Sequence, residues 1–253
     1  MTPDSFSDGG RYLALDAAVA HGMEMVAQGA DIIDVGGEST RPGAGSVPQE
    51  VELDRVLPVI EALSGHVRVS IDTVKPEVAR AALRAGATLV NDVSSSLFEV
   101  AAGGGAGWVA VHMQGTPETM QAAPHYEDVV GEVVGFLLER AQLALAAGVQ
   151  EVWVDPGIGF GKTMAHNLSL LHHLPELVAA AAAAGCAGVV VGTSRKRFLG
   201  LLTSGTDEPS AVDDRLEASL ATAALALVSG ASMVRVHDVP VTLQAARLYG
   251  PAA

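Results

Sequence analysis

The segment Arg84-Ala85-Gly86-Ala87-Thr88-Leu89-Val90-Asn91-Asp92-Val93 contains the unit from which the chain is built. It starts at the end of an alanine-rich stretch with helical spacing, passes through a Gly-Ala pair, and becomes a short apolar run with polar residues at its end. The same order of helix end, Gly-Ala pair and apolar run recurs at Gln28–Asp31 and Ser229–Ser232. This repetition predicts successive β-α segments and a parallel sheet.

Seven short apolar runs are predicted as strands, and six longer stretches have the apolar spacing of helices. Most of the short runs are continuous rather than alternating, as expected for strands buried on both faces. The predicted strands are Asp31–Val35, Val67–Ile71, Thr88–Val93, Trp108–His112, Val152–Asp155, Val189–Gly192 and Met233–His237. The predicted helices are Leu15–Gln28, Pro48–Leu63, Pro76–Ala85, Glu127–Ala147, Leu168–Ala184 and Arg215–Ser229.

This alternation predicts a single α/β domain over residues 1–253, a TIM (β/α)8 barrel whose first strand is missing from the chain. Such barrels commonly take about 250 residues, and the turn-rich Thr2 to Gly10 is typical of the loop that follows a strand. The alternative is an open, doubly wound sheet. No Gly-x-Gly-x-x-Gly follows the first predicted strand, which argues against dinucleotide binding in such a sheet.

Composition excludes several classes of partner. The formal net charge of −14 repels phosphate backbones and anionic lipid, so neither nucleic acid nor a membrane is an expected partner. No apolar stretch is long enough for a membrane span, and the N-terminus lacks the features of a signal peptide. A single cysteine, Cys186, rules out disulfides within the chain. We therefore expect a cytoplasmic protein.

Polar side chains end nearly every predicted strand, at the edge where β/α barrels place their active sites. One Asp after a strand is commonly a helix cap or turn residue, but the repetition at successive strand ends favours a functional site. Cations after the last two strands predict an anionic, phosphorylated ligand, and acceptors after the earlier strands predict a donor-rich heterocycle. The cations are Arg195, Lys196, Arg235 and His237, and the acceptors are Asp34, Asp72, Asn91 and Asp155.

The glycine-rich segment Gly157-Ile158-Gly159-Phe160-Gly161-Lys162-Thr163 is not a nucleotide P-loop. That motif requires a glycine five residues before Gly161, and Pro156 stands there. The segment is predicted instead to be a flexible loop after Asp155, with Phe160 available to pack on a flat ligand.

Five segments, in order along nearly the whole chain, resemble the signatures of the dihydropteroate synthase family. The resemblance implies a barrel enzyme of folate biosynthesis, a sulfonamide target, that joins 6-hydroxymethyl-7,8-dihydropterin pyrophosphate to p-aminobenzoate. The products would be 7,8-dihydropteroate and pyrophosphate. It further implies Mg2+ as a cofactor and a homodimer formed through the later helices. The five segments are Thr2–Gly10, Asp34–Gly43, Asp155–Lys162, Ser194–Arg197 and Arg235–Asp238.

The resemblance also implies a role for each site residue. Asp72 would stabilise a cation that forms when the bridging methylene carbon loses pyrophosphate. Asp4 and Arg41 lie on loops that would close over the site, and with Asp72 and Lys196 they make up the expected catalytic set. The pterin ring would contact Asp72, Asn91, Asp155 and Lys196, with Asp34 beside them, and pyrophosphate would contact Arg235 and His237. The surroundings of p-aminobenzoate would be Thr40, Pro42, Phe6, Phe160, Lys196 and Ser194.

The sequence departs from the family at its start. The family's first strand ends in Asn-Val-Thr-Pro-Asp-Ser-Phe, and Met1 stands at the Val position. The Asn that helps to bind Mg2+ and pyrophosphate would lie upstream, so no metal ligand is expected within the chain. We expect a start placed too late rather than a true truncation. Two alternatives are a catalytically silent pterin-binding paralogue and a pterin-dependent methyltransferase, although a methyl donor has no pyrophosphate to hold.

Overall fold

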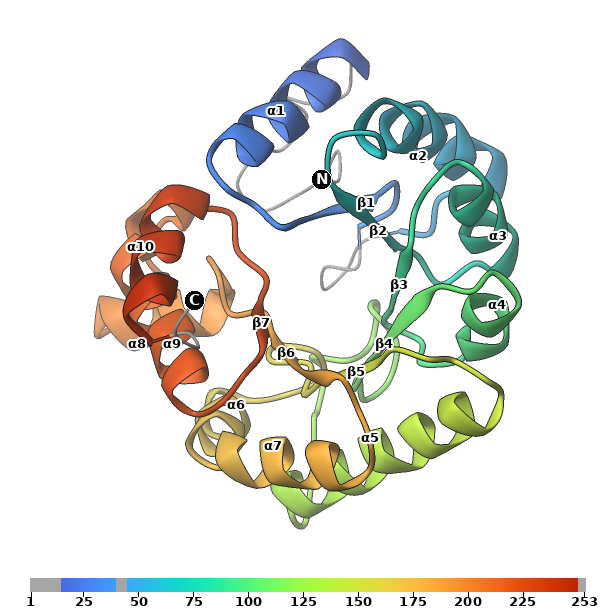
Figure 1. Ribbon diagram of the computed structural model, residues 1–253. Helices are drawn as coiled ribbons and strands as arrows, with labels where there is room; N and C mark the ends of the chain where they lie inside the picture. The colour runs from blue at the N-terminus through green and yellow to red at the C-terminus, as the bar shows by residue number, and fades with distance from the viewer. Residues whose placement is uncertain (1–14, 40–44, 250–253) are drawn as a thin grey trace.

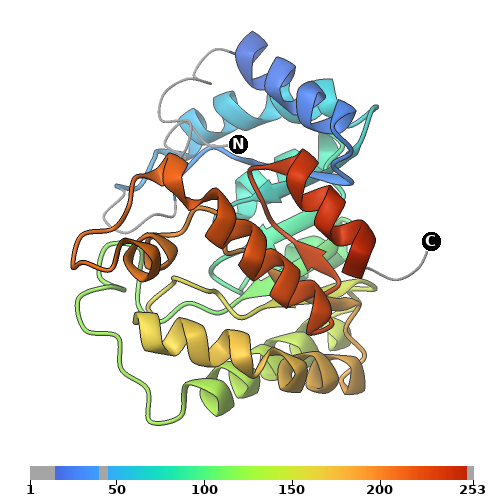
Figure 2. The same ribbon diagram turned by 90° about the vertical axis from the view of Figure 1, so that its left-hand side faces the viewer.

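The structure is a computed structural model that describes residues 15–39 and 45–249. Its strands are all parallel and follow one another in chain order around a single curved sheet (Figure 1). Helices lie outside the sheet, as Figure 2 shows from the side on which the last helices face the viewer. The strands are β1 (Ile32–Gly36), β2 (Arg68–Asp72), β3 (Leu89–Asp92), β4 (Gly107–Val111), β5 (Val152–Asp155), β6 (Gly188–Val191) and β7 (Met233–Val234).

The helices alternate with the strands, so each parallel pair is joined by a helical crossover. They are α1 (Leu15–Ala27), α2 (Gln49–Leu63), α3 (Pro76–Arg84), α4 (Phe98–Gly103), α5 (Val129–Ala146), α6 (Met164–His172), α7 (Leu174–Ala183), α8 (Arg197–Ser204), α9 (Leu216–Val228) and α10 (Val239–Tyr249), with a 3₁₀ helix, η1 (Val212–Arg215).

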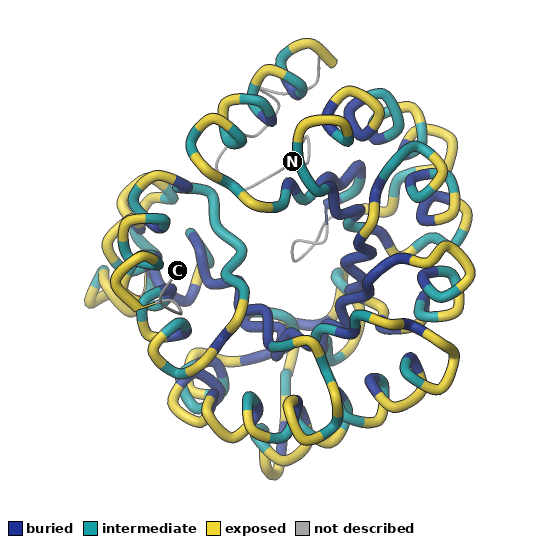
Figure 3. The backbone as a smooth tube through the Cα atoms, in the orientation of Figure 1, coloured by how far each residue is buried: buried dark blue, intermediate teal, exposed yellow. Residues whose placement is uncertain are grey.

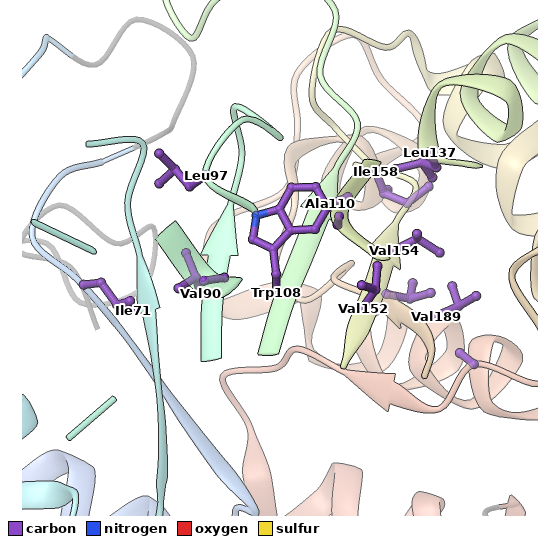
Figure 4. Packing of buried hydrophobic residues seen from close by; sticks show 14 of the residues in the cluster. Ile71, Val90, Leu97, Trp108, Ala110, Leu137, Val152, Val154, Ile158 and Val189 are labelled. Carbon is purple, nitrogen blue, oxygen red and sulfur yellow. The ribbon is translucent and has the colours of Figure 1, made fainter. Parts of the chain in front are cut away.

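The main hydrophobic core lies between the sheet and the ring of helices. Side chains alternate along each strand, and the outward ones, such as Val90 and Trp108, are fully buried against helices (Figure 4). The same pattern appears in Figure 3, where buried strands lie inside helices whose outer faces are exposed. A second, smaller cluster, which includes Leu89, Val109 and Val190, faces the barrel interior. Burial on both faces explains why these strands are apolar throughout.

The sheet is open on one side among the described residues. β1 pairs only with β2, β7 pairs only with β6, and no strand in 15–39 or 45–249 connects the two edges. α1 and α10 flank this opening (Figure 1). The α/β barrel class is confirmed, with the seven predicted strands present and no eighth strand in the part of the chain that the structure describes.

Several predicted boundaries are wrong. The last strand, predicted to reach His237, ends at Val234. The single helix predicted over Leu168–Ala184 is two helices, because Pro175 cannot continue α6 and instead starts α7. α6 begins earlier than predicted, where Thr163 caps it by accepting a hydrogen bond from the His166 backbone N–H at 3.2 Å. Three α-helices, α4, α8 and α10, and the 3₁₀ helix η1 were not predicted.

None of the helices described in the structure combines the length and apolar character needed to cross a membrane.

Candidate active site

Polar side chains point into the barrel at the carboxyl ends of its strands. Asp34, Asp72, Asn91 and Asp155 alternate with outward-facing apolar residues, and parallel pairing aligns them, with Asp72 directly opposite Asn91. Asp34, Asp72 and Asn91 line a cavity of about 1170 Å³, a size suited to small-molecule ligands. Other sequence-predicted residues also line this cavity, namely Phe160, Ser194, Arg195, Lys196, Arg235 and His237.

Arg235 bridges two of these carboxylates. Its Nη1 lies 3.3 Å from Asp34 Oδ2, and its Nη2 lies 3.4 Å from Asp155 Oδ2. Burial opposes the charge of Arg235, but Asp34, Asp155 and Asp72 together raise its pKa above the ordinary value. Asp155 is only 2% exposed and is absent from the cavity lining. Its Oδ2 therefore faces the guanidinium of Arg235.

Asp72 lies in an environment that disfavours its charge. Burial, followed by repulsion from Asp34, raises its pKa to about 7, although Arg235 opposes this rise. Among the described residues, Asp72 Oδ1, Asn91 Nδ2 and Ser70 Oγ are buried without a hydrogen bond of normal geometry, although the neighbouring Asn91 amide still lowers the pKa of Asp72. Buried polar groups are normally satisfied, so these three indicate a polar ligand that supplies the complementary groups.

Lys196 lies at the mouth of the cavity, held by the loop after β5. Its Nζ donates to the carbonyl of Ile158 and lies 4.5 Å from the centroid of the Phe160 ring. Burial lowers the pKa of Lys196 to about 8, although the nearby Asp155 opposes this fall. The ring of Phe160 therefore has the ammonium of Lys196 over one face.

Ser194 and His237 form a second pair at the same rim. The Ser194 Oγ accepts a hydrogen bond from the His237 backbone N–H at 3.2 Å and lies 3.0 Å from His237 Nδ1. β7 ends at Val234, so neither Arg235 nor His237 lies on the strand that was predicted over Met233–His237. Both residues still line the same cavity.

Arg195 was predicted as one of the anion-binding cations, but its guanidinium is occupied by a carboxylate. Its Nε and Nη2 donate to the two oxygens of Asp238 at 3.0 and 2.5 Å. This bidentate pair joins the loop carrying Ser194 and Lys196 to the loop carrying His237. Arg195 also adopts a left-handed backbone, with φ of 58°. Its side chain therefore connects two loops of the site.

Replacing Asp238 with Ala should lower the free energy of unfolding by about 1 kcal/mol, since the half-buried pair is lost and Arg195 remains. Urea denaturation measures this change. Asp213→Ala is a matched control, because Asp213 is 84% exposed and only 4.0 Å from the same arginine. Equal effects of the two substitutions would contradict a special role for the Asp238 pair.

Five predicted residues, Asp4, Phe6, Thr40, Arg41 and Pro42, lie outside the described residues. Sequence reasoning missed Ser70 and Lys162, which also line the cavity. Ser70 occupies the inward position two residues before Asp72, and strand alternation alone could have found it. Lys162 was considered only as part of the rejected P-loop and as the end of the Asp155–Lys162 segment, with no role of its own.

No three His, Cys, Asp or Glu side chains within residues 15–39 and 45–249 come close enough together to hold a metal ion. The described residues therefore do not fit a dedicated metal site of this kind.

Comparison with known proteins gives one consistent result. A family model described as pterin binding enzyme matches residues 1–237. The dihydropteroate synthase of Mycobacterium leprae (strain TN) is 47% identical over 99% of this chain and 90% of its own length. The Yersinia pestis dihydropteroate synthase structure with a sulfonamide drug complex superposes with a TM-score of 0.90, at 41% identity, covering 98% of this chain and 90% of that one. The Xanthomonas albilineans dihydropteroate synthase with 4-aminobenzoic acid gives a TM-score of 0.86 at 45% identity, covering 98% and 88%. The chain therefore belongs to the pterin-binding enzyme family, among the dihydropteroate synthases.

Proposed function

We propose that a single barrel domain in this chain condenses 6-hydroxymethyl-7,8-dihydropterin pyrophosphate with p-aminobenzoate, giving 7,8-dihydropteroate and pyrophosphate. The observation that carries this proposal is the set of unsatisfied polar groups of Ser70, Asp72 and Asn91 inside the cavity. A pterin ring presents amino and amide edges, which complement a carboxylate, an amide and a hydroxyl.

Bond breaking is favoured by the charges of the site. The bond between the bridging methylene carbon and the pyrophosphate oxygen breaks, and the electron pair leaves with pyrophosphate. The cation left on the pterin lies among acceptors, and Asp72 stabilises it. Arg235 and His237, at the rim, hold the departing anion. Arg235 gives up its contacts with Asp34 and Asp155 to do so, which exposes Asp155 to the ring.

The aryl amine of p-aminobenzoate then forms the new C–N bond. Its neutral nitrogen supplies the electron pair, and it loses a proton to solvent after the bond forms. Phe160 and Lys196 suit an aromatic carboxylate such as p-aminobenzoate. The Phe160 ring offers a stacking face, and the Lys196 ammonium offers a positive charge. Thr40, Pro42 and Phe6 belong to this subsite by resemblance, and Asp4 and Arg41 to the loops that cover it.

Mg2+ and the homodimer enter the proposal by family resemblance alone, and the cytoplasmic location is proposed from the single cysteine and the composition of the chain. A divalent ion of this kind commonly takes its ligands largely from substrate phosphates and water. It would supply charge neutralisation to the leaving pyrophosphate, and the described side chains carry out the remaining steps proposed here.

Pyrophosphate release separates this function from its alternatives. With Mg2+ and the pterin pyrophosphate, we expect release that depends on p-aminobenzoate and a product with the mass of dihydropteroate. A silent paralogue would bind the pterin and release no pyrophosphate. Methyl transfer from a reduced folate, without pyrophosphate release, would favour the methyltransferase, an alternative that the relatives do not support.

A further inference from the structure

Lys162 belongs to the loop that joins β5 to α6, and its amine is buried between this loop and the end of β4. Lys162 is 3% exposed. Its Nζ lies 2.9 Å from His112 Nδ1 and 3.3 Å from the His112 carbonyl oxygen, both at the end of β4. It also lies 3.1 and 3.0 Å from the carbonyl oxygens of Gly157 and Phe160. Four acceptors surround an amine with at most three N–H bonds, so none of its donors is left for a ligand.

Glycines allow the loop to press against β4. Gly157 and Gly161 have φ of 64° and 62°, in the left-handed region that side chains disfavour. A Cβ on Gly157 would lie 1.8 Å from the His112 carbonyl oxygen, and one on Gly161 would lie 2.4 Å from the Gln114 carbonyl oxygen. This close approach is what brings the Lys162 amine within reach of His112.

The other side of the same loop faces the active site. Lys162 contacts the carbonyl oxygens of Gly157 and Phe160. In the same turn, the Ile158 carbonyl oxygen accepts a hydrogen bond from Lys196, and the Phe160 ring lies beneath the Lys196 ammonium. The Ile158 side chain is itself fully buried in the outer core (Figure 4). At the start of the loop, the Gly157 N–H donates to Asp155 Oδ1 at 2.7 Å. The loop thus supplies hydrogen-bond partners to two predicted substrate-binding residues, Asp155 and Lys196.

We propose that Lys162 is a positioning residue, whose amine ties the Gly157–Phe160 turn to His112 and thereby fixes the carbonyl and ring that orient Lys196. For substrate binding this inference rests on the proposed function, because Lys196 is assigned there to the pterin and p-aminobenzoate.

The electrostatics agree with this geometry. Burial, followed by the charge of Lys162, lowers the pKa of His112 to about 3, so its imidazole is neutral and accepts at Nδ1. Burial also lowers the pKa of Lys162 to about 7, with Asp155 opposing and Lys196 adding to the fall.

The direct test observes Lys196 rather than activity. The chain has three lysines, Lys75, Lys162 and Lys196, so NMR of protein labelled at the lysine ε carbon gives few signals. In Lys162→Met the titration midpoint of Lys196 should rise by about one pH unit or more, toward the ordinary value of about 10.4, because a displaced loop lets water reach an amine whose pKa is lowered by burial. Lys75→Met assigns its own signal and should leave the Lys196 midpoint unchanged.

Loss of a nearby charge would also raise that midpoint, so a second variant separates the two causes. Gly157→Ala keeps all three ammonium groups but forces the loop away from His112, and it should shift Lys196 in the same direction. If Lys162→Met does not fold, His112→Leu removes one acceptor and should give a smaller shift. Circular dichroism shows which variants fold. An unchanged Lys196 midpoint in folded Gly157→Ala or His112→Leu protein overturns the proposal.

Kinetics then connect the loop to catalysis. In Lys162→Met the KM for p-aminobenzoate should rise about tenfold, with a smaller change in kcat, since a misplaced binding group weakens substrate positioning. A shifted Lys196 in a protein that never releases pyrophosphate would refute the proposed function and keep the positioning role. Full activity of the variant with an unchanged Lys196 midpoint would support the proposed function and refute the positioning role of Lys162.

Discussion

Asp72→Asn is expected to lower kcat/KM by about a thousandfold and at the same time to raise the melting temperature at pH 8. The loss of activity follows because a neutral amide cannot stabilise the pterin cation, and one such electrostatic partner is commonly worth about 10² to 10³ in rate. The gain in stability follows because Asp72 ionises in a place that disfavours its charge, with a pKa raised from 3.8 to about 7.

The pH dependence of the second effect has a definite sign. Between pH 4 and 7 the folded protein holds a proton on Asp72 that the unfolded chain has released, so the free energy of unfolding falls as the pH rises through this window. Above about pH 7 the Asp72 carboxylate is ionised in the folded protein, and the full destabilisation is present. Asn cannot ionise, so the difference in melting temperature between variant and parent should grow from pH 4 to pH 7 and then level off.

Scanning calorimetry at several pH values, with steady-state kinetics, measures both effects. Asp54→Asn is the matched control, because Asp54 lies exposed on α2, and it should change neither quantity appreciably. A lower melting temperature for Asp72→Asn at pH 8 would show that the ionised carboxylate is stabilised by its surroundings, contrary to the electrostatics described above.

The sequence was sufficient to find the inward-facing ring of polar groups. Asp34, Asp72, Asn91 and Asp155 each follow a short apolar run, and parallel strands bring their carboxyl ends to one edge whatever the loops between them do. The period of two along each strand also fixes their direction. These inferences depend only on local spacing and on one rule of topology, which is why they agree with the structure.

Residues whose role depends on a distant partner could not be predicted in this way. Arg195 and Asp238 are far apart in the chain, and nothing in either segment shows that the carboxylate neutralises the guanidinium. Lys162 has the same difficulty, since its role depends on His112 at the end of another strand. Helix ends are easier to predict from the sequence, because Pro175 alone indicates the boundary between α6 and α7.

Arg235→Met should destabilise the protein by about 3 kcal/mol at neutral pH and abolish p-aminobenzoate-dependent pyrophosphate release. The guanidinium compensates Asp34 and the almost fully buried Asp155, and removing one partner of a buried charge cluster leaves the other charges uncompensated. Arg235 also holds down the pKa of Asp72, so that pKa should rise further in the variant.

The same reasoning predicts how the loss depends on pH and on geometry. Below about pH 5, where uncompensated carboxylates take up protons, the stability difference between Arg235→Met and the parent should shrink. Arg235→Lys restores a charge but lacks a planar fork to span Asp34 and Asp155, so it should recover part of the stability and little of the pyrophosphate release. Urea denaturation at pH 5 and pH 7.5 measures the first effect. A loss of stability that is equal at both pH values would mean that Arg235 stabilises the barrel by packing. It would also mean that Asp34, Asp72 and Asp155 do not need the charge of Arg235 to stay ionised.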